Sequence, residues 1–185
     1  GWLFMFPTIG NVDIMPDFIG FLIMLKGLSC ACRYCRCFDL TRRLAMFGAL
    51  FSLVSWAYQM FCWLDIISAS AVGTVMRVAY AVFLCAYAIN LAISISKIAT
   101  ETELPKIRVR GAAAVPLAII MLLCGRLAWS GAVSVISSAE KGATISETLK
   151  WAMRIGYIAE VLFVVYMLLL LLSCYRWICL EGEED

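Results

Sequence analysis

Four closely spaced cysteines carry the clearest potential for chemistry in this chain. Cys30, Cys32, Cys35 and Cys37 form the pattern C-x-C-x2-C-x-C. Clustered thiolates can bind Zn²⁺ or Cu⁺ or react with oxidants, although structural Zn²⁺ sites normally use two C-x2-C pairs set well apart. Two interpretations stay open: a metal or redox site, and a group of reduced cysteines at a membrane interface. Beyond Zn²⁺ or Cu⁺ at this cluster, no cofactor is predicted.

The charge around these cysteines is positive. Arg33, Arg36, Arg42 and Arg43 flank the cluster. Because a nearby cation stabilises a thiolate, we expect them to lower the thiol pKa values.

Seven ionisable residues form a second candidate site, because they lie within or at the edge of long apolar stretches. An ionisable side chain in a bilayer costs from about 2.5 to well over 10 kcal/mol and therefore needs partners. They are Asp13, Asp17, Asp65, Arg77, Arg126, Arg154 and Glu160. They predict either a buried ion-pair network that sets helix register, or a polar cavity open to the outside that recognises an anionic group or relays protons.

The deepest members of this set are Arg126 and Glu160. At a rise of about 1.5 Å per residue, each lies roughly 18–20 Å from the loop between the last two apolar stretches. Helices joined by a short loop are antiparallel neighbours. We therefore expect Arg126 to meet Glu160 near the membrane centre.

The elements that must position these residues are membrane helices. Hydrophobic residues make up 64% of the 185-residue chain, against roughly 45–50% in soluble domains. Apolar runs of about 20 residues recur, as a bilayer-spanning helix requires. We predict an all-α integral membrane protein with four transmembrane helices plus one shorter N-terminal helix that spans or re-enters the bilayer. Residues 1–185 would form a single transmembrane domain, with no soluble domain.

The predicted helices cover residues 13–28, 44–67, 74–98, 111–138 and 149–180. Asp13 is a suitable N-cap for the first, and Pro16 falls in its first turn. A basic connection over residues 29–43 precedes the second helix, and a polar loop over residues 99–110 precedes the fourth.

Basic residues gather on one predicted side of the membrane. Ten of the fifteen Lys and Arg residues belong to it: Lys26, Arg33, Arg36, Arg42, Arg43, Lys97, Lys106, Arg108, Arg110 and Arg176. Short connections rich in Lys and Arg stay in the cytoplasm. This predicts that the visible N-terminus is outside and that the C-terminus is cytoplasmic.

Small residues recur at three- and four-residue spacing on the predicted helix 74–98. They are Ala81, Cys85, Ala88, Ala92 and Ser96. Small residues on one face let helices approach closely. We expect a buried seam, either within the chain or against a partner helix or a second copy. Asn90 points off this face and is expected to bond to another helix.

The start of the first helix carries a recognisable segment. Asp13, Pro16, Asp17 and Phe18, followed by Ile19 and Gly20, read D-x-x-P-D-F-I-G. This segment resembles the helix start of uncharacterised small bacterial multi-pass membrane proteins. The resemblance implies a helical architecture and a location in the bacterial plasma (inner) membrane, without implying an activity.

These features predict a small transport or ligand-binding protein with an outward-facing charged cavity. The alternatives are a structural or accessory membrane subunit that binds a partner helix, and a thiol or metal sensor on the cytoplasmic face. An enzyme is not favoured, because the sequence has no histidine and no Walker A, G-x-G-x-x-G, G-x-S-x-G or H-E-x-x-H motif. The lipid bilayer is the predicted partner. Nucleic acid is not, because the net charge is only +2 and no basic stripe carries interleaved aromatics.

Overall fold

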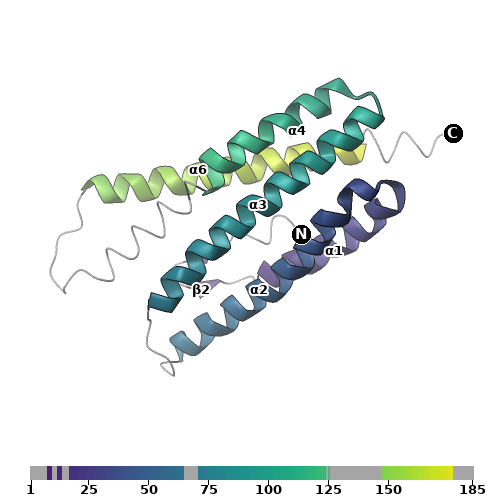
Figure 1. Ribbon diagram of the computed structural model, residues 1–185. Helices are drawn as coiled ribbons and strands as arrows, with labels where there is room; N and C mark the ends of the chain where they lie inside the picture. Colours follow the sequence, from purple (N-terminus) through teal and green to yellow (C-terminus); the bar gives the residue numbers. More distant parts are fainter. Residues whose placement is uncertain are drawn as a thin grey trace.

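The computed structural model describes residues 8–9, 12–13, 17–64, 71–123, 125 and 147–176. Their regular elements are helices, apart from the paired strands β1 (Thr8–Ile9) and β2 (Val12–Asp13). The helices are α1 (Asp17–Tyr34), η2 (Arg36–Phe38), α2 (Asp39–Trp63), α3 (Ala71–Glu101), α4 (Pro105–Leu117), η3 (Ala118–Leu123) and α6 (Glu147–Cys174) (Figure 1). The predicted helical architecture is confirmed.

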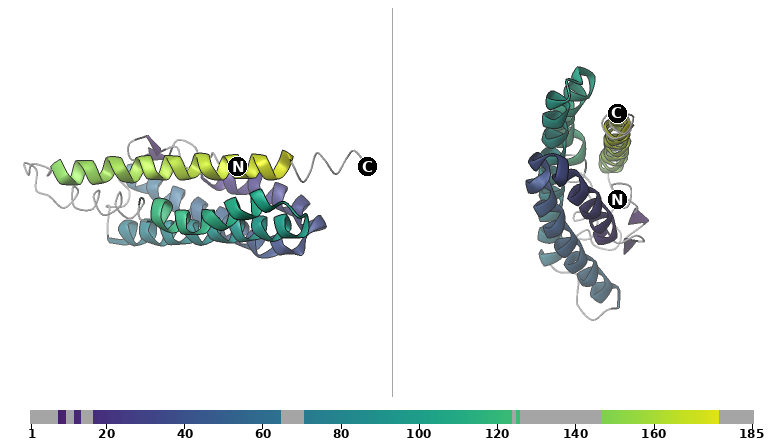
Figure 2. Two further views of the ribbon diagram at one scale, coloured as in Figure 1. Left: turned by 90° about the horizontal axis from the view of Figure 1, so that it is seen from above. Right: turned by 90° about the vertical axis from the view of Figure 1, so that its right-hand side faces the viewer.

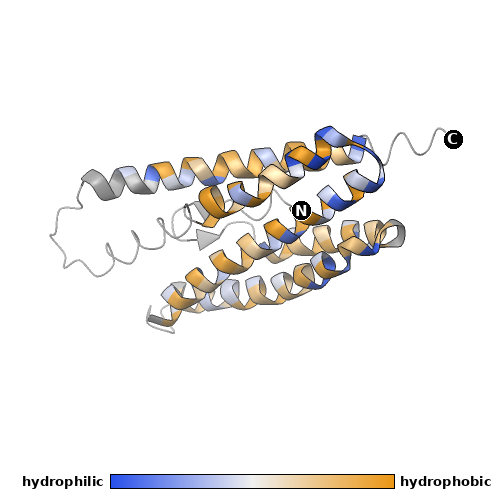
Figure 3. Ribbon diagram, turned by 45° about the horizontal axis from the view of Figure 1, so that its top comes forward, coloured by the Kyte–Doolittle hydropathy of each residue, from blue (hydrophilic) through white to orange (hydrophobic). Residues whose placement is uncertain are grey.

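Three described segments are long and apolar enough to cross a membrane: Arg36–Cys62, Val72–Glu101 and Arg154–Cys174. Hydrophobic residues dominate these segments (Figure 3), and many large apolar side chains along them are exposed. On α2, for example, Phe47, Leu50 and Val54 are 61%, 58% and 58% exposed and recur at helical spacing. An apolar stripe of this kind is unfavourable in water and suits a lipid environment.

α2, α3 and α4 form a layer, and α1 and α6 lie over parts of one face of it (Figure 2). α3 packs against both α2 and α4, α1 packs against α2, and α6 packs against α4 and η3 (Figure 2). The Tyr166 hydroxyl of α6 donates a hydrogen bond to the Arg110 carbonyl oxygen at 2.7 Å. The core follows α3, on which Leu84, Tyr87, Leu91 and Ile95 are almost completely buried.

Phe21 fills the space where the first three helices meet. Its ring lies 5.3 Å from that of Tyr87 and 6.1 Å from that of Phe83, centroid to centroid. On α2, a Cβ atom at Gly48 would lie only 2.5 Å from the Phe21 ring. Gly48 therefore lets an aromatic side chain enter between α1 and α2.

The first helix differs from its predicted range at both ends. Asp13 is not an N-cap, because it belongs to strand β2 and pairs with Thr8 of β1, which makes its backbone extended. The helix starts at Asp17 and continues to Tyr34. Residues 29–43 contain no proline or glycine to stop a helix, so most of the predicted basic connection is helical. Only Cys35, with φ −139° and ψ 122°, and the single turn η2 separate α1 from α2.

The predicted polar loop over residues 99–110 is instead a tight corner between α3 and α4. The Leu104 N–H donates to the Ala99 carbonyl at 2.9 Å, and the Glu103 N–H donates to the Thr100 carbonyl at 3.3 Å. Glu103 has a φ of 55°. This is the Schellman pattern of helix termination, with a left-handed residue after the last helical turn. Pro105 then starts α4, where its missing N–H costs little.

The fourth predicted helix begins earlier than residue 111 and changes its winding. α4 carries Pro116 inside it and passes directly into the π-helix η3. Because Pro116 has no N–H to give to the preceding turn, the local hydrogen-bond pattern is free to widen. The remainder of the predicted range, residues 126–138, lies outside the described residues.

The small-residue seam on α3 is confirmed as a buried surface. Ala81, Cys85, Ala88 and Ala92 are all less than 5% exposed, and Ser96 is partly buried. α4 and η3 lie against this face: a Cβ atom at Gly111 would collide with Ser96 Oγ, and Cys85 Sγ lies 3.6 Å from the Ala118 carbonyl oxygen. The seam is therefore occupied within the chain. A partner helix or second copy at this face stays a prediction.

The prediction that Asn90 bonds to another helix is wrong, because its side chain bonds within α3. The Asn90 side-chain nitrogen donates to the Ala86 carbonyl oxygen at 2.8 Å. An amide four residues after a carbonyl on one helix can reach it without any partner helix.

Candidate functional site

The Asp17 carboxyl group is the most buried ionisable side chain among the described candidates. Asp17 opens α1, is 7% exposed, and accepts a hydrogen bond from the Tyr80 hydroxyl of α3. Tyr80 is 9% exposed. Asp17 and Tyr80 therefore form a polar contact inside the apolar bundle, between residues that are 63 positions apart.

Arg77 lies one helical turn before Tyr80 on α3. Residues three positions apart share a face of a helix. Whereas Tyr80 is buried, Arg77 is exposed. α3 thus presents an exposed guanidinium group one helical turn from the buried contact between the Tyr80 phenol and the Asp17 carboxyl group.

α6 carries two further candidates, Arg154 and Glu160. Arg154 is exposed, and its guanidinium carbon lies 5.2 Å from the centroid of the Trp151 ring, within range of a cation–π interaction. Glu160 is half-buried. The six residues that separate them place the two side chains on different faces of the helix.

A close backbone approach lies beside the predicted Arg126–Glu160 pair. A Cβ atom at Gly125 would stand 2.8 Å from the Gly156 carbonyl oxygen of α6. Gly156 precedes Glu160 by about one turn. Arg126 and Asp65 lie outside the described residues, as does the side chain of Asp13. The Arg126–Glu160 ion pair therefore stays a prediction.

The four clustered cysteines separate into two kinds. Cys35 and Cys37 are joined by a disulfide bond at the corner between α1 and α2, whereas Cys30 is a free, exposed thiol and Cys32 a free, partly buried one on α1. The disulfide takes two of the four predicted metal ligands. Among the described residues, no group of three or more His, Cys, Asp and Glu side chains is placed to hold a metal ion.

The corner that carries the disulfide is held against α3 by hydroxyl groups. Ser94 Oγ lies 2.9 Å from the Cys37 carbonyl oxygen and 3.1 Å from Thr41 Oγ1. Thr41 and Ser94 are both buried. Neither was among the predicted site residues, because a single Ser or Thr in an apolar stretch gives no sign of the distant carbonyl that it will meet.

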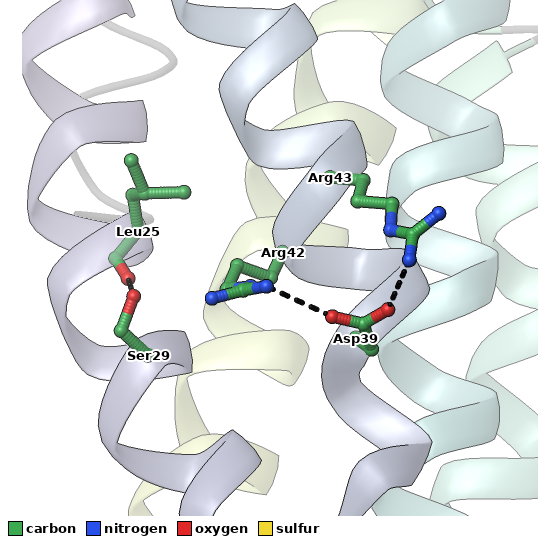
Figure 4. A network of polar contacts seen from close by, with 5 residues as sticks. All are labelled: Leu25, Ser29, Asp39, Arg42 and Arg43. Atoms are coloured by element: carbon green, nitrogen blue, oxygen red, sulfur yellow. Dashed lines mark hydrogen bonds and ion pairs between the residues drawn. The ribbon is translucent and has the colours of Figure 1, made fainter.

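The arginines near the cysteines are partly neutralised. Arg42 and Arg43 both bond to the Asp39 carboxylate, at 3.0 and 2.8 Å (Figure 4). Burial raises the pKa of the Cys32 thiol; Arg42 lowers it and Asp39 raises it, and the net shift is upward. For Cys32, the expected lowering of the thiol pKa is therefore wrong, because desolvation outweighs the nearby cation.

The most hydrophilic described residues gather toward the end of the bundle where α1 meets α2 and α3 meets α4 (Figure 3). Four basic side chains are exposed at the α3–α4 corner: Lys97, Lys106, Arg108 and Arg110. Arg36 is exposed at η2. The Asp17–Tyr80 contact lies away from this basic end.

Comparisons of the chain with family models, with curated proteins and with solved structures find no match.

Proposed function

We propose that the chain is a multi-pass membrane protein that binds or carries a small anionic solute at an outward-facing polar site. The observation that carries the proposal is the Asp17–Tyr80 contact, a carboxyl group and a phenol buried among helices with apolar outer faces. Ionisable groups in such surroundings are costly and normally mark a binding or transport path.

The arginines supply the recognition of an anion. Arg77 and Arg154 are exposed, and a guanidinium group matches the geometry of carboxylate and phosphate oxygens. Arg126, which the sequence predicts to pair with Glu160, is the third arginine of the proposed site. Asp17 and Glu160 balance this positive charge in the proposed site, and a bound anion adds its own contacts with the arginines.

The proposed orientation rests on the basic end of the bundle. The exposed lysines and arginines at the α1–α2 and α3–α4 corners favour a cytoplasmic location for that end. Arg77 and Asp17 are then nearer the outer surface, with the visible N-terminus outside and the C-terminus inside. The bacterial plasma membrane is the location that the D-x-x-P-D-F-I-G segment implies.

Binding can be tested by thermal unfolding of the purified protein in detergent, with inorganic phosphate and with succinate as probes. A ligand at 100 times its Kd stabilises the folded state by about 2.7 kcal/mol. Arg77→Gln and Arg126→Gln should remove that shift. Arg108→Gln, which alters an exposed arginine of α4 at the basic end of the bundle, should retain it.

Two results would contradict the proposal. One is the absence of any shift with either probe in the unaltered protein. The other is a shift of equal size in Arg77→Gln, Arg126→Gln and Arg108→Gln, which would indicate a general effect of salt on the protein.

A further inference from the structure

We propose that Cys35–Cys37 is a redox-active disulfide that exchanges with a low-molecular-weight thiol at the basic end of the bundle. The bond lies away from the Asp17–Tyr80 contact, so the inference is independent of the proposed solute site. It stands on the position of the disulfide, the hydrogen bonds around its sulfur atoms, and the contacts that hold its backbone.

The disulfide closes a very small loop. Its two cysteines are separated by Arg36 alone. The stabilisation that a disulfide gives through loop closure grows with the length of the loop. A bond that closes so short a loop restricts the unfolded chain little and therefore adds little stability. A role in holding distant elements together is excluded, because both cysteines belong to the same corner. The bond is therefore better explained by its chemistry than by its effect on stability.

The two sulfur atoms have different surroundings. Cys35 is buried, whereas Cys37 is only partly buried. The Cys37 backbone N–H donates to Cys35 Sγ at 3.3 Å. A hydrogen bond to sulfur stabilises the thiolate form, and a more stable thiolate leaves more readily during exchange. Cys37 is thus the more exposed of the two residues, so its Sγ is the atom attacked in this proposal and Cys35 Sγ is the leaving group.

The contacts with α3 keep the corner in place when the disulfide opens. Ser94 Oγ bonds to the Cys37 carbonyl oxygen, and its carbonyl oxygen lies 3.7 Å from Cys37 Sγ. In the reduced state, the Cys37 thiol can donate a hydrogen bond to the Ser94 carbonyl oxygen. Because both sulfur atoms remain on a fixed backbone, the disulfide can form again.

The environment suits an anionic thiol such as glutathione. Arg36 lies between the two cysteines and is exposed, and a local positive charge raises the concentration of anions around it. In the orientation proposed above, this end faces the cytoplasm. Disulfides there are normally transient, catalytic or redox-sensing.

The exchange proceeds in two balanced steps. A glutathione thiolate attacks Cys37 Sγ, the Cys35–Cys37 bond breaks, and Cys35 leaves with the electron pair as a thiolate. A second glutathione thiolate then attacks the glutathione sulfur of the mixed disulfide and releases Cys37 as a thiolate. The protons of the two glutathione thiols end on Cys35 and Cys37. Two glutathione molecules are oxidised to one glutathione disulfide, and the protein disulfide is reduced.

Trypsin makes this exchange measurable in the purified full chain. Cleavage after Arg33 and Arg36 puts Cys35 and Cys37 on different peptides, and Cys30 and Cys32 on a third. The protein is equilibrated with mixtures of reduced and oxidised glutathione, quenched with acid, alkylated, digested and analysed by mass spectrometry. We expect the linked Cys35 and Cys37 peptides to convert together into two alkylated peptides as the share of reduced glutathione rises.

Two variants identify the attacked sulfur. In Cys35→Ser, reaction with oxidised glutathione should form a mixed disulfide at Cys37. In Cys37→Ser, the buried Cys35 should take up less. Cys30→Ser is the matched control, because it removes an exposed free thiol and should leave the transition unchanged.

Three outcomes would overturn the inference. In the first, the oxidised protein yields no linked peptides. In the second, the linked peptides persist in excess reduced glutathione. In the third, Cys35 in Cys37→Ser takes up as much glutathione as Cys37 does in Cys35→Ser. The first two outcomes are measured on the unaltered protein, so they do not depend on the folding of any variant.

Discussion

At the scale of single residues, buried polar groups find their partners on other helices. The Asp17 carboxyl group accepts a hydrogen bond from Tyr80, and Thr41 shares a hydrogen bond with Ser94. A buried polar atom that loses its partner costs more than a hydrogen bond contributes, because it can no longer turn to water. These contacts therefore specify which faces of α1, α2 and α3 must meet.

Tyr80→Phe should destabilise the protein by about 1–3 kcal/mol, because the buried Asp17 carboxyl group loses a hydroxyl donor. The unfolding free energy in detergent measures this change. The matched control is Tyr157→Phe, which removes the same hydroxyl from an exposed position on α6 and should alter stability by less than about 0.5 kcal/mol. Equal effects of the two substitutions would contradict the structural importance of the Asp17–Tyr80 contact.

At the scale of elements, the spacing between α3 and α4 depends on small residues. Gly111 on α4 faces Ser96 and the Ala92 carbonyl oxygen, which a Cβ atom would approach to 3.3 Å. The tight Schellman corner joins the two helices through three residues, 102–104. Because the corner is short, α4 cannot move away from α3 without disturbing both the Gly111 contact and the corner.

Gly111→Ala should destabilise the protein by about 1–3 kcal/mol, because the added methyl group overpacks the α3–α4 contact. Gly27→Ala is the matched control on α1: apart from the adjoining residues and the backbone of its own helix, nothing lies within 4 Å of the added Cβ, and replacing a mid-helix glycine should stabilise by about 0.5–1 kcal/mol. Chemical or thermal unfolding in one detergent gives both values. If Gly111→Ala were as stable as Gly27→Ala, the helices would not be in close contact there.

At the scale of the whole molecule, the described helices are apolar on the outside and basic at one end. α2 and α6 expose stripes of large apolar side chains. The exposed Lys and Arg side chains gather where α1 meets α2 and where α3 meets α4. A bilayer satisfies the first property, and the cytoplasmic side of a membrane matches the second. The two properties together give the orientation a direct test.

A membrane-impermeant maleimide should label Cys30 only in inverted membrane vesicles, because this exposed free thiol lies at the basic end of the bundle. Labelling is measured on the isolated protein after each reaction, and Cys30→Ser shows how much of the signal belongs to this residue. Labelling of Cys30 in right-side-out vesicles would reverse the proposed orientation, and with it the outward-facing site.

Several features were predictable because they depend on composition and local pattern. The helical class, the approximate centres of α2, α3 and α6, the buried seam on α3 and the gathering of basic residues all follow from runs of apolar residues and the spacing of small and charged ones. Helix ends were less predictable. Asp13 lies in a strand and Glu103 takes a left-handed conformation, because backbone pairing and chain reversal decide these positions.

What the sequence by itself determined is the apolar helical character of the chain and its basic end. Only the tertiary structure decided that Asp17 meets Tyr80, that Ser94 anchors the corner carrying Cys37, and that Cys35 bonds to Cys37. The physical reason is that hydropathy is a property of each residue and its neighbours. A hydrogen bond or a disulfide requires two particular atoms to meet, and the packing of the helices and the shape of the turns between them set those distances.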